Sequence, residues 1–556
     1  MLPLTEPAVR LIPLGGLGEI GLNMMLVEFG DDLIAVDCGL MFPDAEEMPG
    51  IDYIIPDFSY ALAKREGFRA VVLTHGHEDH VGALPYLLRQ AHLPVYGTPL
   101  TLALVADKLR EHDLLAPADL RVIRPRDRIE IGPFRIEPIR VTHSIADGIG
   151  LAIETPVGTL VHTGDFKLDA TPLDGETPDY RRFTELGEQG VLLLCSDSTN
   201  VDRPGHTRSE AEVGVALRER FQGASGRVIV ATFASHIHRI QQVLALAAEH
   251  GRQVALLGMS MQKNVAIASE RGYLKIPPGV LLPLEELAAL PPRRQVILST
   301  GSQGEPHSAL ALMAAGEHKA IQVERGDLVI ISARVIPGHE RTIGRVVNAL
   351  LRLGAEVLYD DNAFVHVSGH ASQEDLKDML NLTRPRYFVP VHGEYRHLLG
   401  HARLAESLGL GAERIFLIED GMGLEVTKTA ARVVGGYPVG RVLVDGKGVG
   451  DIGAVVLRDR QLLAQDGLVT IGLVVGRDGA VKAGPEIVSR GFVYVKENEP
   501  LLDELRDAIL AALAGREPAA AVDREAIAGL VRATVRSFIN QRFQRKPVVL
   551  PVILEV

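Results

Sequence analysis

Short apolar runs alternate with glycine-rich turns at the start of the chain. Residues 8–40 contain three such runs, VRLIPL, NMMLVEFG and LIAVDCG, and this pattern predicts β-strands. Gly16, Gly18 and Gly21 match G-x-G-x-x-G, but a strand-like run follows where a dinucleotide-binding site would need a helix. We therefore interpret these glycines as tight turns between strands.

The pattern of the next region predicts strands that end in polar turns. Residues 69–90 contain the apolar strand AVVL, a histidine-rich turn and the amphipathic helix VGALPYLLRQ. Further strands are expected to end near Thr142, His162 and Leu194. From about 205 to 360, strand, Gly/Ser loop and helix follow one another repeatedly, which is typical of an α/β domain with a parallel sheet.

The α/β block is predicted to be an insertion, because the earlier pattern resumes after it. RYFVPVHGE predicts a strand that ends in His392, followed by a helix to about Leu408. Residues 429–455, rich in Gly and Val, predict a linker, and residues 456–556 predict a small α+β domain of strands followed by helices.

Composition narrows the class of protein. The 556 residues are 46% apolar and 23% charged, which is typical of a multidomain globular protein, and no apolar run is long enough to cross a bilayer. The first residues do not resemble a secretory signal, so we expect a cytoplasmic protein. Cys38 and Cys195 are too few for a disulfide framework, and both are expected to be reduced and buried.

The net charge of −13 changes this picture little. An acidic protein is a poor candidate for non-specific binding of nucleic acid. A narrow basic cleft could still guide a phosphate backbone, and a metal site would itself consume carboxylates. Charge therefore leaves a nucleic-acid partner open.

Candidate chemistry is concentrated in His75-Gly-His77-Glu-Asp79-His80, between a predicted strand and a predicted helix. Imidazole nitrogens and carboxylate oxygens suit Zn²⁺ and Mn²⁺ alike. A turn after a strand can direct such side chains into one cavity. The alternative, a solvated polar turn that caps the helix, explains the density of ligands poorly.

Three further candidates, His143, Asp165 and His392, each follow an apolar, strand-like run. Each alone is more typical of a turn residue than of a ligand. Their common position favours ligands, and together the seven side chains could form two adjacent sites. Two metals about 3.5–4 Å apart need a bridging carboxylate, for which Asp165 is the natural choice.

HGHEDH, followed by a later His, Asp and His in this order, resembles the metallo-β-lactamase superfamily. The resemblance implies an αββα sandwich built from residues 1–204 and 361–428. It also implies that Asp165 is shared between a metal held by His75, His77 and His143 and a second metal held by Asp79, His80 and His392. Asp37 in IAVDCG matches the superfamily's first motif, which implies that it orients the ligands; a turn aspartate explains it equally well.

The insertion indicates a long substrate, because 227 positions separate Asp165 from His392. SDSTN with Asp197, HVSGHAS with His370 and VHGE with His392 resemble three motifs of the β-CASP nucleases, which implies that 205–360 is a β-CASP domain. VLVDGKGVGDIGAVVLRDR, SRGFVYVKE and KPVVLPVILEV resemble the carboxy-terminal part of the ribonuclease J family.

This resemblance implies a ribonuclease with two divalent metal ions, Zn²⁺ or Mn²⁺, that acts in RNA maturation and decay. It would degrade RNA in the 5′-to-3′ direction from a 5′-monophosphate end and also cut internally. It also implies a homodimer through the third domain and is compatible with a place in an RNA-decay complex.

The chemistry needs a nucleophile and a proton. Two metals would make hydroxide available near neutral pH and neutralise charge on the phosphate during in-line attack. The leaving 3′ oxygen needs a proton, which His370, expected to open a helix after the strand-like FVHVS, could supply, with Asp197 as the second candidate. The alternative for His370 is a satisfied histidine at a helix start.

Glycine- and serine-rich turns before helices are candidate phosphate sites, because free backbone N–H groups bind anions there. The main candidate is the segment His366, Val367, Ser368, Gly369 and His370. Ser235 and His236 in FASHIH, the loop 301–304 and Arg334 have a similar setting. Plain helix capping by serine is the alternative.

Three other functions compete with this hypothesis. A small-molecule hydrolase of the same fold would not need the inserted domain or the pair Asp197 and His370. A nuclease for DNA or transfer RNA would not explain the resemblance at the carboxy terminus. A non-catalytic RNA-binding scaffold should have lost ligands, and all seven are present.

Overall fold

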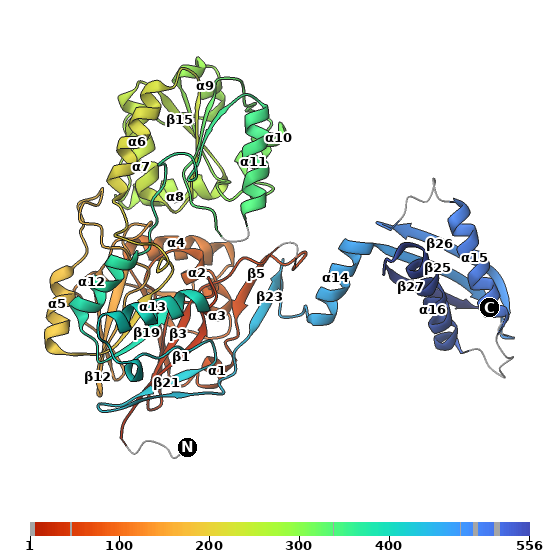
Figure 1. Ribbon diagram of the computed structural model, residues 1–556, viewed down its shortest axis with the longest axis horizontal. Helices are drawn as coiled ribbons and strands as arrows, with labels where there is room; N and C mark the ends of the chain where they lie inside the picture. The colour runs from red at the N-terminus through yellow and green to blue at the C-terminus, as the bar shows by residue number, and fades with distance from the viewer. Residues whose placement is uncertain (1–5, 45–46, 337–338, 479, 493–498, 516–522) are drawn as a thin grey trace. The chain divides into compact units, whose positions relative to one another are not determined.

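The computed structural model describes residues 6–44, 47–336, 339–478, 480–492, 499–515 and 523–556 (Figure 1). The chain divides into two compact units. Unit 1 comprises residues 1–41 and 55–441, and unit 2 comprises residues 42–54 and 442–556. Unit 1 contains the histidine-rich turn and all predicted site residues.

An eight-stranded sheet forms one layer of unit 1. Three of the predicted strands lie next to one another in its centre, and parallel strands extend it at one edge. In spatial order the strands are β22 (Ala431–Val434), β21 (Gly423–Val426), β1 (Val9–Gly15), β3 (Met24–Phe29), β4 (Asp32–Val36), β6 (Phe68–Val72), β7 (Pro94–Gly97) and β8 (Asp119–Val122).

A six-stranded sheet forms the second layer. Its order is β19 (Tyr387–Val391), β13 (Val191–Asp197), β12 (Gly158–His162), β11 (Ile149–Thr155), β10 (Phe134–Arg140) and β9 (Ile129–Ile131). β19 pairs in parallel with β13, although about 190 residues separate the two strands in the sequence. The strand that carries His392 therefore returns to the sheet that was begun before the insertion.

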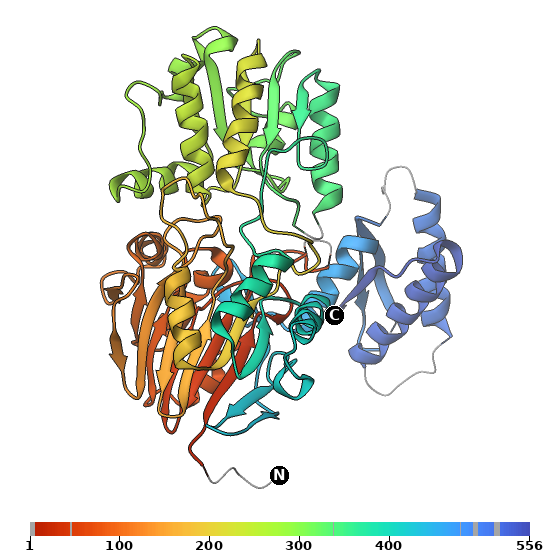
Figure 2. The same cartoon turned by 60° about the vertical axis from the view of Figure 1, so that its left-hand side comes forward.

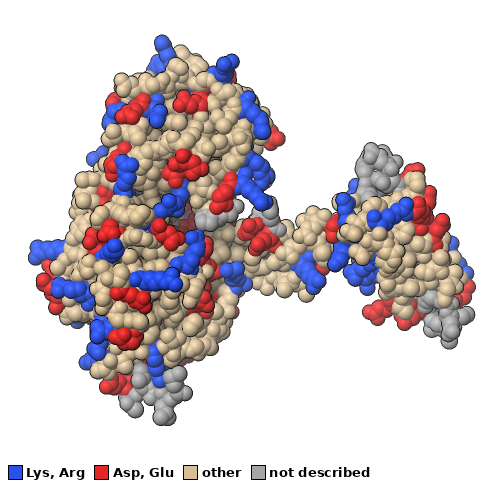
Figure 3. Space-filling model, viewed as in Figure 1, with Lys and Arg blue, Asp and Glu red and all other residues tan. Residues whose placement is uncertain are grey.

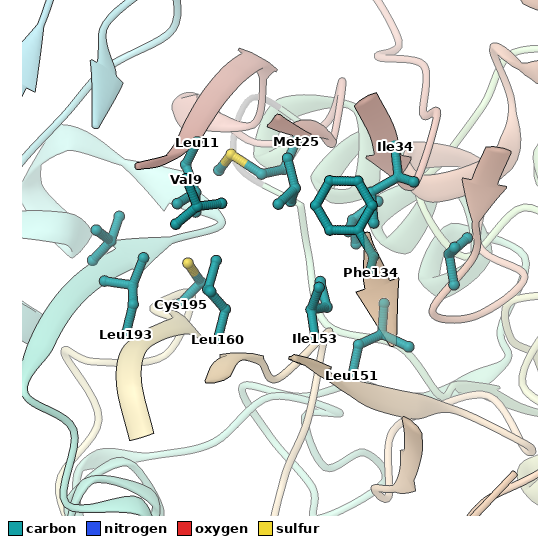
Figure 4. Packing of buried hydrophobic residues seen from close by; sticks show 14 of the residues in the cluster. Val9, Leu11, Met25, Ile34, Phe134, Leu151, Ile153, Leu160, Leu193 and Cys195 are labelled. Carbon is teal, nitrogen blue, oxygen red and sulfur yellow. The ribbon is translucent and has the colours of Figure 1, made fainter. Parts of the chain in front are cut away.

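Apolar side chains of the two sheets face each other and form the main core (Figure 4). Leu11, Met25 and Ile34 come from the first sheet, and Leu151 and Leu193 from the second. Helices α5 (Tyr180–Gln189), α12 (Gln373–Thr383) and α13 (Tyr395–Ser407) cover the outer face of the second sheet. α1 (Ser59–Ala63), α2 (Glu78–Val81), α3 (Leu84–Leu88) and α4 (Pro99–Glu111) complete the helices of the first half. The expected αββα sandwich is confirmed.

The predicted parallel α/β block is confirmed as well (Figure 2). All its strands are parallel, in the order β15 (Gln253–Leu257), β16 (Gln295–Ser299), β14 (Val228–Ala231), β17 (Leu328–Ile331) and β18 (Glu356–Leu358). One face packs on α6 (Glu210–Gly223), α7 (Ile237–Glu249) and α8 (Met259–Glu270). The other packs on α9 (Leu284–Ala288), α10 (Ala309–Ala315) and α11 (Glu340–Arg352).

Unit 2 is an α+β domain with a three-stranded sheet. β25 (Leu468–Val475) lies between antiparallel β26 (Val481–Arg490) and parallel β27 (Val548–Glu555). α15 (Glu499–Ala514) and α16 (Arg524–Phe543) pack on one face of this sheet. The unit also contains α14 (Ala454–Asp466). Across the described ranges, no helix is long and apolar enough to span a membrane.

The structure differs from three predicted elements. The helix expected over 81–90 is two short helices, α2 and α3, because Pro85 in the first turn of α3 has no N–H to continue a helix. FVHVS at 364–368 has no strand structure, and the following helix begins only at Gln373, beyond His370. The segment 429–455 is not an unstructured linker, since β22, β23 (Arg441–Asp445) and β24 (Gly448–Val449) lie within it.

The smaller predictions hold. Gly16, Gly18 and Gly21 adopt φ angles of 92°, 89° and 102°, which only glycine takes without strain, so they turn the chain as expected. Among the described residues, both cysteines are free and buried.

Candidate metal centre and nuclease site

The structure brings all seven predicted ligands together at strand ends. His75 to His80 follow β6, His143 follows β10, Asp165 follows β12 and His392 follows β19. His392 has a φ of 55°, a left-handed conformation that costs about 1 kcal/mol or more and that the surrounding structure must impose.

One group of ligands contains three imidazoles. The nitrogens of His75, His77 and His143 lie within 4.8 Å of one another. His77 Nδ1 is 3.1 Å from His75 Nε2 and 3.2 Å from His143 Nε2. Burial lowers the pKa of all three, that of His77 to about 4, so each ring is neutral at pH 7, as metal ligation requires.

The second group contains two imidazoles and two carboxylates. Ligand atoms of Asp79, His80, Asp165 and His392 also lie within 4.8 Å of one another. Asp79 Oδ2 is 3.5 Å from His80 Nε2 and 3.4 Å from His392 Nε2. Burial alone would lower the pKa of His392, but the carboxylates around it, Asp165 first, raise that pKa to about 10.

A single oxygen atom of Asp165 connects the two groups. Its Oδ2 lies 3.7 Å from His75 Nε2 and 3.8 Å from His143 Nε2 on one side. On the other side it lies 3.2 Å from His80 Nε2 and 3.7 Å from His392 Nε2. Four imidazole nitrogens thus surround one carboxylate oxygen, at the spacing expected of ligands that point toward shared cations.

These donors fit two divalent metal ions. Nitrogen and oxygen ligands without thiolates suit Zn²⁺ and Mn²⁺. Asp165 is buried, and burial would raise its pKa, but the neighbouring histidines, His392 first, hold the pKa well below its usual range. A buried carboxylate that stays ionised is a suitable ligand for a cation, and bound metal ions would supply positive charge beside it.

Asp37 lies behind the ligands and holds two of them in place. It accepts hydrogen bonds from the backbone N–H of Thr74 at 2.7 Å and from the Thr74 hydroxyl at 2.8 Å, and it lies 2.8 Å from His80 Nδ1. The Thr74 hydroxyl in turn lies 3.0 Å from His75 Nδ1. With Nδ1 of each ring occupied, Nε2 faces the metal centre.

Asp197 and His370 form a pair beside the metal centre. His370 Nδ1 lies 2.8 Å from Asp197 Oδ2. Burial alone would lower the pKa of His370, but attraction to the Asp197 carboxylate raises it. Burial alone would raise the pKa of Asp197, but attraction to His370 lowers it. Asp197 also accepts a hydrogen bond from the Thr199 hydroxyl, which lies 2.6 Å from His392 Nδ1.

The segment 366–370 packs against the metal centre. The carbonyl oxygen of Gly369 is 2.8 Å from His143 Nδ1. The carbonyl oxygen of His370 accepts hydrogen bonds from the side chains of Asn200 and Thr207. Val367 buries its side chain in the core of the inserted domain, so only its backbone can face a substrate.

The candidate phosphate residues of the inserted domain lie near this segment. Ser235 and His236 stand between β14 and α7, and the His236 ring is 6.5 Å from the ring of His366. The Arg334 guanidinium donates to the side chain of Asn200 at 2.8 Å. In the loop 301–304, Gln303 instead binds the backbone of Arg334 and Ile336, which is a structural role.

Three residues that contact candidate ligands, Thr74, Thr199 and Asn23, were not predicted from the sequence. Thr74 directly precedes His75, and Thr199 is two positions after Asp197. Their closeness to predicted site residues is the only feature of the sequence that could have indicated them. The Asn23 side chain donates to the carbonyl oxygen of Asp79 at 3.0 Å and lies 3.1 Å from His80 Nε2. Nothing in the sequence connects Asn23 with residues more than fifty positions away.

Known families match most of the chain. The metallo-beta-lactamase superfamily matches residues 17–201, and the Zn-dependent metallo-hydrolase RNA specificity domain matches residues 357–417. The beta-CASP domain of ribonuclease J matches residues 225–350, and the ribonuclease J C-terminal domain matches residues 455–556. The four matches follow the order of the elements described above.

Two curated relatives match over nearly their full lengths. Ribonuclease J of Thermus thermophilus is 46% identical, covering 98% of this chain and 95% of that relative. Ribonuclease J2 of Bacillus subtilis is 40% identical, covering 99% of each chain.

A solved structure supports the fold alone. A protein of unknown function from Enterococcus faecalis V583 superposes with a TM-score of 0.52 at 16% identity, covering 76% of this chain and 100% of that one. The relatives, in contrast, are similar enough in sequence to establish descent. By its domains, its relatives and its cluster of metal-binding side chains, the chain belongs to the ribonuclease J family of metal-dependent ribonucleases.

Proposed function

We propose that this chain hydrolyses RNA at a centre of two divalent metal ions, Zn²⁺ or Mn²⁺, through the seven ligands named above. His75, His77 and His143 would hold one ion and Asp79, His80 and His392 the other, with Asp165 shared. The observation that supports this assignment most strongly is the position of Asp165 Oδ2 among four imidazole nitrogens.

The bound ions would supply hydroxide near neutral pH and neutralise charge on the scissile phosphate. The chain's own residues set the geometry. Asp37 and Thr199 fix the rings of His80 and His392 through their Nδ1 atoms. The metal-facing nitrogens are therefore positioned before any substrate arrives.

His370 is our candidate proton donor for the leaving 3′ oxygen. Asp197 holds its Nδ1, and no described residue hydrogen-bonds its Nε2, which is free to face a substrate. The ring is also partly exposed, unlike Asp197, which is buried. Asp197 therefore orients the ring, while His370 exchanges the proton.

The substrate end is the second part of the proposal. Residues 366–370, together with Ser235 and His236, would bind the 5′-monophosphate, so that RNA is degraded in the 5′-to-3′ direction; internal cleavage would use the same centre. Acidic and basic side chains are interspersed on the face of unit 1 drawn in Figure 3. Recognition of the phosphate therefore depends on local contacts more than on a long-range field.

The test uses one single-stranded RNA, labelled at its 5′ end and bearing a monophosphate or a triphosphate, beside matched DNA and the His77→Ala variant. The metal-loaded protein should release labelled mononucleotide, faster from the monophosphate, and the variant should not. Full activity of His77→Ala would refute the metal assignment. Binding of RNA without cleavage in Zn²⁺ or Mn²⁺ would instead support a scaffold. If the protein neither binds nor cleaves RNA, the result would support a small-molecule hydrolase.

We also propose that the chain acts as a homodimer through unit 2, in the cytoplasm, with an RNA-decay complex as a further setting. The sheet face opposite α15 and α16 exposes apolar side chains that a second copy could cover. They are Val488 on β26 and Leu550, Val552 and Leu554 on β27, between 42% and 58% exposed. Apolar faces of this kind mark interaction sites.

For the domain organisation, we propose residues 1–204 and 361–428 as the metallo-β-lactamase domain, 205–360 as the inserted domain and 456–556 as the carboxy-terminal domain. The connection over 429–455 is partly structured, and its β22 extends the eight-stranded sheet. That strand is better assigned to the first domain.

A further inference from the structure

Arg239 is a fully buried arginine on α7, in the inserted domain. A buried guanidinium costs several kcal/mol of desolvation, which a single ion pair rarely offsets, so burial of this charge is poor evidence of a contribution to stability. Apolar residues of similar volume would fill the same space. The role of an arginine at this position must therefore be sought in the groups that accept hydrogen bonds from its guanidinium.

The guanidinium connects α7 with three other segments. Its Nε donates to the carboxylate of Glu210 on α6 at 2.7 Å and to the side chain of Gln242 at 3.0 Å. Its NH1 donates to the hydroxyl of Ser332, directly after β17, and to the carbonyl oxygen of Val365 at 2.6 Å. Ser332 donates to the same carbonyl at 2.7 Å.

Val365 is the residue before the segment 366–370. With two donors on its carbonyl oxygen, the start of that segment is fixed to the inserted domain. The far end of the segment is fixed to the first domain through Gly369 and His370, which contact His143 and Asp197. Arg239 is therefore the support at one end of a segment whose other end touches the metal centre.

The same network ends in histidines with unused nitrogens. Glu210, the partner of Arg239, lies 3.6 Å from Nε2 of His236. His236 is 2% exposed, and neither of its ring nitrogens has a hydrogen-bond partner among the described residues. Nδ1 of His366 also lacks such a partner. Buried nitrogens without partners are costly, and a bound anion is a ligand that could accept hydrogen bonds from them.

We propose that Arg239 is a positioning residue for the 5′ phosphate of the substrate. It holds the start of the segment that carries His366 through the Val365 carbonyl, and it holds Glu210, whose carboxylate lies 3.6 Å from His236 Nε2. Both rings would then line one phosphate site. The planar fork of five donors explains why arginine is needed, since a lysine ammonium cannot reach Glu210, Ser332 and Val365 together. This inference rests on the proposed recognition of a 5′ phosphate.

The experiment compares RNA of one sequence bearing a 5′-monophosphate or a 5′-hydroxyl. We expect Arg239→Lys to reduce the ratio of the two kcat/KM values about tenfold or more, because small displacements of positioning groups have effects of this size. The loss should appear mainly as a higher KM for the monophosphate substrate. Ser332→Ala, which removes one hydroxyl, should reduce the ratio less, in the same direction.

Arg227→Lys is the matched control. Arg227 is also buried and also binds one carboxylate and one carbonyl oxygen, those of Asp327 and Gln322. It lies before β14, at the opposite end of the sheet from Ser332. This variant should keep the wild-type ratio even if its melting temperature falls.

A second measurement tests binding without turnover. It compares the affinity of metal-free protein for adenosine 5′-monophosphate with its affinity for adenosine.

Each outcome separates the two proposals. Suppose that wild-type protein prefers the monophosphate RNA. If Arg239→Lys keeps the full preference, or lowers kcat/KM for both RNAs by the same factor, Arg239 is not a positioning residue. If wild-type protein has no preference, the proposed recognition of the 5′ phosphate fails, and the role of Arg239 falls with it. If Arg239→Lys does not fold, Ser332→Ala and the nucleotide affinities decide the question.

Discussion

Gly369 shows how tightly single residues are packed around the metal centre. A Cβ atom at this position would lie 2.6 Å from Nδ1 of His143 and 2.7 Å from the backbone nitrogen of Ser144. Atoms cannot approach so closely, so Gly369→Ala must displace either the segment or His143. We expect this variant to bind less than the full complement of Zn²⁺, with a loss of RNA cleavage, as measured by metal analysis and a cleavage assay.

Gly344→Ala is the control for that substitution. Gly344 lies within α11, and apart from its chain neighbours and the backbone of its own helix no described atom is within 4 Å of where its Cβ would be. Alanine in a helix interior is more stable than glycine by about 0.5–1 kcal/mol. This variant should keep its metal and activity and melt slightly higher. Full metal content in Gly369→Ala would contradict the packing argument.

Thr199 tests how the ligands are held. Its hydroxyl lies 2.6 Å from His392 Nδ1 and donates to Asp197. Thr199→Val keeps the shape and removes the hydroxyl, and loss of such supporting contacts typically weakens metal binding about 10- to 100-fold. Competition with a chelator should reveal this loss, while Thr199→Ser should bind Zn²⁺ like the wild type. Equal affinity in both variants would show that the hydroxyl is not needed.

Asp420 predicts a pH dependence of stability. Burial and the nearby charge of Glu19 raise its pKa from about 3.8 to about 8. A carboxyl whose folded pKa is raised stabilises the fold when protonated, so this contribution is present below pH 4 and is lost as the pH rises to about 8. Asp420→Asn stays neutral. Its melting temperature should exceed that of the wild type by more at pH 9 than at pH 5, and a constant difference would contradict the assignment.

At the scale of elements, the strands were predictable and the helix boundaries were not. Alternation and glycine punctuation locate β1, β3, β4 and β6, because buried strands bounded by turns leave a clear pattern. The segment 364–368 alternates in the same way but forms no strand. Its backbone and the residues just after it are used by Arg239, His143 and Asn200, contacts that no local pattern reveals.

β27 is the element whose exposed face carries the proposed dimer contact. A charge in the centre of that face should prevent a second copy from covering it, because a buried unpaired charge is costly. We expect Val552→Lys to shift the protein from dimer to monomer, near 60.1 kDa, in light scattering coupled to gel filtration.

The control for this prediction is Met259→Lys, at an 81% exposed position on α8 in the inserted domain. It should leave the mass unchanged. A monomeric wild type, or a dimeric Val552→Lys, would exclude this face as the contact.

At the scale of the whole molecule, the sequence predicts the insertion and the seven candidate ligands that the structure brings together, because they follow apolar runs and the motifs occur in order. It could not indicate that β19 pairs with β13. Nor could it separate the candidate phosphate residues, since Gln303 and Ser235 occupy similar loops. Their difference is set by distant partners, such as the backbone of Arg334 beside Gln303.

The return of β19 to the first sheet has a consequence for biosynthesis. A ribosome produces the inserted domain after Asp165 and before His392, so the 226 residues between them must be made before His392 can complete the second group of candidate ligands. A nascent chain halted after β13 and before β19 has only one of the two groups, and the edge of β13 that pairs with β19 is unpaired. The candidate metal centre is therefore complete only in the last third of translation, after His392 has been made.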